Sequence, residues 1–202
     1  MSYRRITLIA IALLVLSCSR VGAKFDTSTV WRIETPEKLG SGFVYHSTPW
    51  ATWILTCCHV VDIYTYAAVY KPNSMQVYLG KVVAREPILD CAVIKVSTGR
   101  WAALSFGEDV QMGDGLAGFG YVVKGHGLYT EGIKMGAVGW RSMTSSQLGF
   151  GASGGPVVSR ENGKVCGMLD AVQSPVSAQP GNTYIPVKIL KEWLKQVHLY
   201  NS

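Results

Sequence analysis

The sequence predicts an all-β protein, and three observations lead to that prediction. After about residue 28, short apolar runs follow one another and are separated by Gly, Pro, Asn and Asp. Helical stretches are few, so the strands do not alternate with helices as they do in a parallel sheet. Glycines also lie inside several runs, where barrels bend their strands sharply. We therefore expect an antiparallel sandwich or barrel whose strands cover residues 30–33, 41–45, 52–56, 77–83, 91–96, 115–121, 156–158, 165–169 and 183–185.

The composition is that of a compact protein without a strongly charged surface. The 202 residues are 48% hydrophobic and 16% charged, which excludes general disorder. The formal net charge is +6, but the basic residues form neither a cluster nor an aromatic–basic stripe. Proteins that track a nucleic acid backbone carry such features. We therefore expect no nucleic-acid partner.

One helix is expected, at the C-terminal end of the chain. Pro186 stands where a helix can begin. The residues that follow it recur at steps of three and four, which places them on one helix face. This apolar face consists of Val187, Leu190, Trp193, Leu194 and Val197. The lysines on the other faces indicate a solvated surface.

The first 23 residues read as an export signal. The basic start MSYRR precedes an apolar run over 6–16 that is too short to span a bilayer. The sequence contains two candidate sites for cleavage of this signal. VLSC resembles a bacterial lipobox with Cys18 as the lipidated residue, whereas the small residues ending at Ala23 suit an ordinary signal peptidase. The prediction is an exported protein that is periplasmic, secreted or anchored to the outer membrane through a lipid. A retained anchor helix is the alternative.

Four further cysteines show no spacing that is typical of a zinc site. They are Cys57, Cys58, Cys91 and Cys166. An exported protein is able to pair its cysteines, but we expect most of these to be small buried side chains with free thiols. No metal and no cofactor are expected.

The segment GFGASGGPVV, residues 149–158, carries one hydroxyl among four glycines, and Ser153 within it matches G-x-S-x-G. In α/β-hydrolases this motif forms an elbow between a strand and a helix, and Asp and His follow it along the chain. Here only Asp170 and His198 follow, without the repeated helices of that fold. Residues 156–158 moreover read as a strand, so the elbow is excluded.

The other arrangement, His then Asp then Ser, is present. LTCCHVVD places His59 after an apolar strand, and LDCAVIKV places Asp90 before another. With GASGGPVV around Ser153, these blocks resemble the three signature blocks of trypsin-like serine proteases. The detail, including GSGFV at 40–44, is closest to the bacterial Deg/HtrA-type branch without a PDZ domain. The resemblance covers about residues 28–198.

The resemblance implies two antiparallel β-barrels of the chymotrypsin type, a C-terminal α-helix and an active site in the cleft between the barrels. The first barrel would occupy residues 24–98, the linker 99–108, and the second barrel with the helix 109–202.

The resemblance also implies a role for each residue. His59 would take the proton of the Ser153 hydroxyl, and Asp90 would orient the imidazole. The backbone N–H groups of Gly151 and Ser153 would form the oxyanion hole. The pocket floor would lie at Gln147, with Asp170 on the wall strand. Asp170 could instead lie beside Asp90, or simply cap a turn.

Two departures from the family pattern matter. Ala152 stands where animal enzymes carry an Asp that pairs with a freshly cut N-terminus, so activation by clipping is not expected. If His59 and Asp90 touch, the neighbouring thiols are close, and a bridge from Cys57 or Cys58 to Cys91 is an open alternative.

The predicted function is that of an exported serine endopeptidase that cuts polypeptide substrates through an acyl-enzyme intermediate. Two alternatives remain open. One is a latent or inactive protease fold that only binds chains, and the other is an esterase that uses the same triad.

Overall fold

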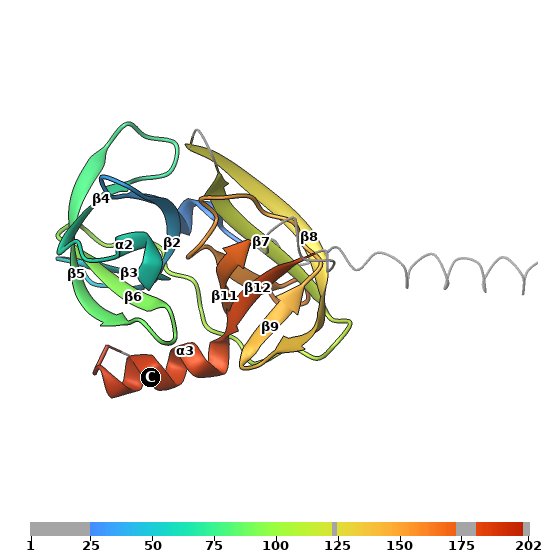
Figure 1. Ribbon diagram of the computed structural model, residues 1–202. Helices are drawn as coiled ribbons and strands as arrows, with labels where there is room; N and C mark the ends of the chain where they lie inside the picture. Colours follow the sequence, from blue (N-terminus) through green and yellow to red (C-terminus); the bar gives the residue numbers. More distant parts are fainter. Residues whose placement is uncertain (1–24, 123–124, 173–180, 200–202) are drawn as a thin grey trace, which may run out of the picture.

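A computed structural model of the chain describes residues 25–122, 125–172 and 181–199, with no account of the side chains of 171 and 172. Within these ranges the strands form two closed antiparallel barrels, shown side by side in Figure 1. The predicted all-β fold with two barrels and a C-terminal helix is confirmed. The first 24 residues, including Cys18 and Ala23, lie outside the described part of the chain.

The first barrel has its strands in the order β1-β2-β3-β6-β5-β4, and β1 pairs with β4 to close it. Its strands are β1 (Val30–Glu34), β2 (Leu39–Ser47), β3 (Thr52–Cys57), β4 (Tyr66–Tyr70), β5 (Val77–Glu86) and β6 (Cys91–Val96). A short 3-10 helix, Thr27–Thr29, precedes β1.

The second barrel has the order β10-β11-β12-β9-β8-β7, closed by the pairing of β10 with β7. Its strands are β7 (Gly115–Val122), β8 (His126–Val138), β9 (Arg141–Thr144), β10 (Pro156–Ser159), β11 (Val165–Val172) and β12 (Asn182–Pro186).

Three of these strands and one helix were not predicted. Strand β8 is the longest of the described strands, but most of its residues are exposed and it carries no apolar run. Strands β4 and β9 are short. The helix α2 (Cys58–Val61) continues the apolar stretch of β3, and no break in hydrophobicity marks where the strand ends. Pairing with neighbours, rather than local sequence, determines these elements.

One hydrophobic cluster runs through both barrels, and a second, smaller one lies within the second barrel. Side chains of the first barrel, such as Phe43 and Ile54, pack in the same cluster as Ala117, Val158 and Met168 of the second. Each of these five residues is at most 1% exposed. Because this core runs across the interface, residues of the two barrels that meet there are held in fixed relative positions.

The segment that connects the barrels bonds to both of them. Leu104 N–H donates to Val44 O of β2 over 2.8 Å. A few residues later, Gly107 N–H donates to Val165 O of β11 over 2.8 Å, and Val165 N–H returns a bond to Ser105 O over 2.9 Å. The connecting segment therefore links the two barrels through backbone hydrogen bonds to each of them.

The C-terminal helix α3 (Val187–Gln196) leaves the second barrel at Pro186 and passes beneath the first barrel (Figure 1). Its apolar face is buried, as predicted, and Leu190, Trp193 and Leu194 join the shared core. Beyond the helix, Tyr45 Oη of β2 donates to Leu199 O over 3.2 Å. In the described ranges, no helix has the length and apolar character that crossing a lipid bilayer requires.

We expect Leu194→Ala to lower the free energy of unfolding by about 2–5 kcal/mol, because it removes a fully buried side chain from the shared core. Urea denaturation followed by tryptophan fluorescence measures the change. Glu192→Ala on the exposed side of the same helix is the control, and it should change stability by less than about 0.5 kcal/mol. Equal effects of the two substitutions would contradict the packing of α3.

Candidate active site

His59 and Asp90 meet because strands β3 and β6 are paired. The register sets Cys57 opposite Cys91, so the residues that follow β3 lie beside the residue that precedes β6. Asp90 adopts a φ of 55°, a left-handed conformation that Asp tolerates better than most residues. In this position the Asp90 carbonyl accepts a hydrogen bond from Cys58 N–H over 3.0 Å.

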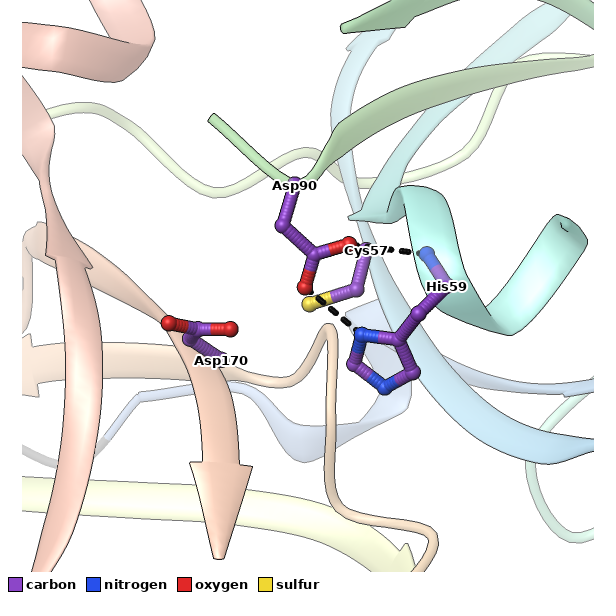
Figure 2. Close-up of side chains that lie close together, drawn as sticks. All are labelled: Cys57, His59, Asp90 and Asp170. Atoms are coloured by element: carbon purple, nitrogen blue, oxygen red, sulfur yellow. Dashed lines mark hydrogen bonds and ion pairs between the residues drawn. The ribbon is translucent and has the colours of Figure 1, made fainter. Parts of the chain in front are cut away.

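The Asp90 carboxylate binds His59 through both of its oxygens, as Figure 2 shows. Oδ1 accepts the backbone N–H of His59 over 2.8 Å, and Oδ2 lies 2.6 Å from the ring Nδ1. Asp90 is 8% exposed, whereas 42% of the His59 side chain is exposed. The aspartate is therefore enclosed, and the imidazole reaches the surface.

Burial opposes the charge of Asp90, but the hydrogen bonds that it accepts from the ring and backbone of His59 hold its pKa below the usual range. An ionised Asp90 keeps the proton of a neutral imidazole on Nδ1. The other ring nitrogen, Nε2, is then an acceptor that can take a proton from a substrate or a nucleophile.

Ser153 lies in a tight turn before β10. Ala152 N–H donates to Gly149 O over 3.2 Å and Gly155 N–H donates to Ala152 O over 2.9 Å, which closes the turn. Gly151 and Gly154 have φ of 96° and 87°, values that favour glycine. In the described part of the chain, the N–H groups of Gly151 and Ser153 donate no hydrogen bond.

Ser41 on β2 fastens this turn to the first barrel. Its N–H donates to Ser153 O over 2.8 Å and its hydroxyl donates to Gly151 O over 2.8 Å. The same hydroxyl accepts Tyr121 N–H of β7 over 2.8 Å. Within GSGFV the sequence offered no reason to single out Ser41, because its partners are about half the chain away.

The structure therefore brings His59 and Asp90 into direct contact and places the Ser153 turn at the same interface. Gly154 N–H donates to Leu169 O over 2.7 Å, and that carbonyl also accepts the Cys57 thiol over 3.1 Å. Among the described residues, the Ser153 hydroxyl forms no hydrogen bond with His59. In resting enzymes such bonds are often long and shorten only with substrate.

The two residues predicted to line a pocket lie in different environments. Gln147 is exposed on the segment between β9 and the Ser153 turn. Asp170 on β11 is 3% exposed and forms an ion pair with Arg141 of β9. Its carboxylate also lies within 4.8 Å of that of Asp90, which matches the second position considered for it. The role of Gln147 in substrate binding stays a prediction.

Donor atoms of Cys57, His59, Asp90 and Asp170 all lie within 4.8 Å of one another (Figure 2). Each already has a protein partner, because His59 binds Asp90, Asp170 binds Arg141 and the Cys57 thiol donates to Leu169 O. We therefore describe this group as a hydrogen-bonded network and assign no metal to it.

The four cysteines of the described chain are free and buried, including Cys57 and Cys91, which face each other across β3 and β6. Burial is the main cause that raises the pKa of both thiols. They are therefore protonated at neutral pH and add no charge beside Asp90.

Comparison with known proteins agrees with this architecture. Residues 40–168 match the family model of the trypsin-like peptidase domain. The chain belongs to the trypsin-like peptidase family. No curated protein sequence matches it. Among solved structures it resembles an inactive form of the serine-to-alanine mutant of Rv3671c from M. tuberculosis, with a TM-score of 0.71 and 19% identity. That match covers 87% of this chain and 89% of the other, and it shows a shared fold.

Gly154→Ala should destabilise the protein by at least about 2 kcal/mol. The φ of 87° disfavours any other residue, and a Cβ would collide with Ser41 O while lying 2.5 Å from Thr56 Oγ1 and 3.1 Å from Cys57 N. Thermal and urea unfolding measure the loss. Gly99→Ala is the matched control, since a Cβ there meets nothing within 4 Å. A Gly154→Ala protein as stable as the control would contradict the contact between the barrels.

Asp170 should make the protein less stable as pH rises from about 4 to about 6. Burial, followed by the neighbouring Asp90 carboxyl group, raises its pKa from 3.8 to about 6 in the folded chain. Within this window the folded state keeps a proton that the unfolded chain has released, so the free energy of unfolding falls with rising pH.

Asp170→Asn should remove that contribution, roughly 3 kcal/mol between about pH 4 and about pH 7. Urea unfolding of both proteins at the two pH values measures it. The same pH dependence with and without the substitution would show that Asp170 ionises normally in the folded chain.

Proposed function

We propose that this protein is a serine endopeptidase whose catalytic residues are His59, Asp90 and Ser153. One observation carries the proposal: an aspartate held in its ionised form binds His59 Nδ1 over 2.6 Å at the interface that also holds the Ser153 turn. The membership in the trypsin-like peptidase family supports it.

In the proposed reaction, His59 Nε2 takes the proton of the Ser153 hydroxyl as the oxygen attacks the carbonyl carbon of a peptide bond. Asp90 holds the ring in position and stabilises the imidazolium that forms. His59 then gives its proton to the leaving amine, and an acyl-enzyme remains on Ser153. Water, deprotonated by the same imidazole, releases the acyl group and restores the serine.

The negative oxygen of each tetrahedral intermediate would be bound by the backbone N–H groups of Gly151 and Ser153. Both N–H groups have no acceptor in the described chain, and the Gly151 carbonyl is turned to the Ser41 hydroxyl instead. Losing one such donor typically lowers turnover by about 100- to 1000-fold.

We further propose that the protein is exported and acts on polypeptides outside the cytoplasm. The support is the basic start and apolar run of residues 1–16. Cleavage before Cys18 would leave a lipid-anchored protein, and cleavage after Ala23 would release it. Mass spectrometry of the mature N-terminus distinguishes the two.

A fluorophosphonate probe should label the purified mature protein at Ser153, because such probes react with serines that a neighbouring base activates. Ser153→Ala and His59→Ala should abolish labelling while the circular dichroism spectrum stays unchanged. Ser105→Ala, at an exposed serine of the connecting segment, should label like the parent protein.

Labelling that survives Ser153→Ala would overturn the assignment of the nucleophile. An unlabelled but folded parent protein would favour the protein that only binds chains. If labelling occurs, hydrolysis of a denatured protein, compared with a short-chain ester, separates an endopeptidase from an esterase.

A further inference from the structure

Asp170 lies behind the His59–Asp90 pair, and the proposed reaction gives it no part. We propose that Asp170 is a positioning residue of this site, which donates a hydrogen bond to Asp90 when protonated and adds a second negative charge behind His59 when ionised. Its effect on catalysis rests on the proposed function, whereas its effect on His59 does not require Ser153.

The backbone directs this side chain toward the interface. In the pairing of β11 with β12, Leu169 lies opposite Tyr184 and Ala171 lies opposite Thr183, so Asp170 is the extra residue of a β-bulge. Bulges re-aim a side chain and are frequent beside active sites. The turn before β10 also holds β11 at this point, because Leu169 N–H donates to Gly155 O over 2.8 Å.

The contacts of Asp170 identify the donor and the acceptor. Asp90 already accepts two hydrogen bonds from His59, and its pKa is lowered. Asp170 is 3% exposed, so its carboxylate would face a second carboxylate without water. A proton on Asp170 that points to Asp90 removes this repulsion and fixes the orientation of the Asp90 carboxylate. Figure 2 shows Asp170 approaching the pair from β11.

Three charged groups lie around Asp170. They are Asp90 before β6, His59 on α2, and Arg141 on β9. The thiols of Cys57 on β3 and Cys91 on β6 also face it, but burial keeps them protonated. One cation, Arg141, therefore balances one of the two carboxylates, and the second is balanced by a proton, either on Asp170 or on His59.

This balance couples Asp170 to His59. The pKa of Asp170 is about 6, so its charge changes in the same pH range in which histidines ordinarily titrate. An ionised Asp170 favours the imidazolium and makes His59 a stronger base. A protonated Asp170 carries no negative charge, but its hydrogen bond still holds the Asp90 carboxylate in position.

The test is a proton NMR titration of the His59 ring in the Ser153→Ala protein, with and without Asp170→Asn. Removing a nearby negative charge should lower the midpoint of His59 by about one pH unit. Asp109→Asn, at an exposed aspartate near the connecting segment, is the control and should leave the midpoint in place. A midpoint that Asp170→Asn does not move overturns the proposal.

A second measurement needs no change at position 170. Carbon NMR of the same protein, labelled at aspartate carboxyl groups, should show one aspartate that titrates near pH 6. Arg141→Gln should move this midpoint to higher pH, because Arg141 lowers the pKa of Asp170. If every aspartate titrates at or below its ordinary value, the proposal is wrong even where Asp170→Asn does not fold.

Catalysis gives the remaining readout. In the background with Ser153 intact, Asp170→Asn should move the acidic limb of the kcat/KM profile to lower pH and reduce kcat on the plateau, since His59 becomes a weaker base. If Asp170→Asn shifts the His59 midpoint but fluorophosphonate does not label the parent protein with Ser153 intact, the proposed function alone is refuted. If the parent protein is labelled but Asp170→Asn leaves the His59 midpoint unchanged, only the role of Asp170 is refuted.

Discussion

The hydrogen bonds of Ser41 are the constraint on which the geometry of the site depends. This residue is fully buried, and its backbone and hydroxyl groups all have partners. Its carbonyl accepts the Thr56 hydroxyl over 2.7 Å, so the strand that carries Ser41 is bonded to the strand that leads to His59. The position of the Ser153 turn relative to His59 is thus fixed by hydrogen bonds to backbone groups across the barrel interface.

The charges of the site are arranged on the side of the imidazole that faces the protein. Two carboxylates and one guanidinium lie on the Nδ1 side of His59, and 42% of the His59 side chain is exposed. Buried charges are costly unless they are paired and hydrogen-bonded. Here every charged group has a partner. The two carboxylates therefore place negative charge next to the imidazole, and no buried ion is left unpaired.

The outline of the fold and the contact between His59 and Asp90 were predictable from the sequence, because the blocks around them carry a recognisable order. Apolar runs also located most strands of the first barrel. Strands β8 and β9 were not predicted from the sequence, since polar residues and glycines interrupt the apolar residues of β8 and β9 has only four residues. The partners of Ser41 and the pairing of Asp170 with Arg141 have no local signature. They follow only from strand order, which places β9 two strands from β11.

The separation of these partners along the chain has a consequence for how the protein reaches its native state. The Ser41 hydroxyl and Gly151 are 110 residues apart, and the Cys57 thiol and Leu169 are 112 apart. Contacts at such separations form slowly, because a long loop must close before they stabilise anything. A chain still emerging from the ribosome has the first barrel complete long before the Ser153 turn exists. Assembly of the site is therefore a late folding event, because it waits until the second half of the chain has been synthesised and has docked.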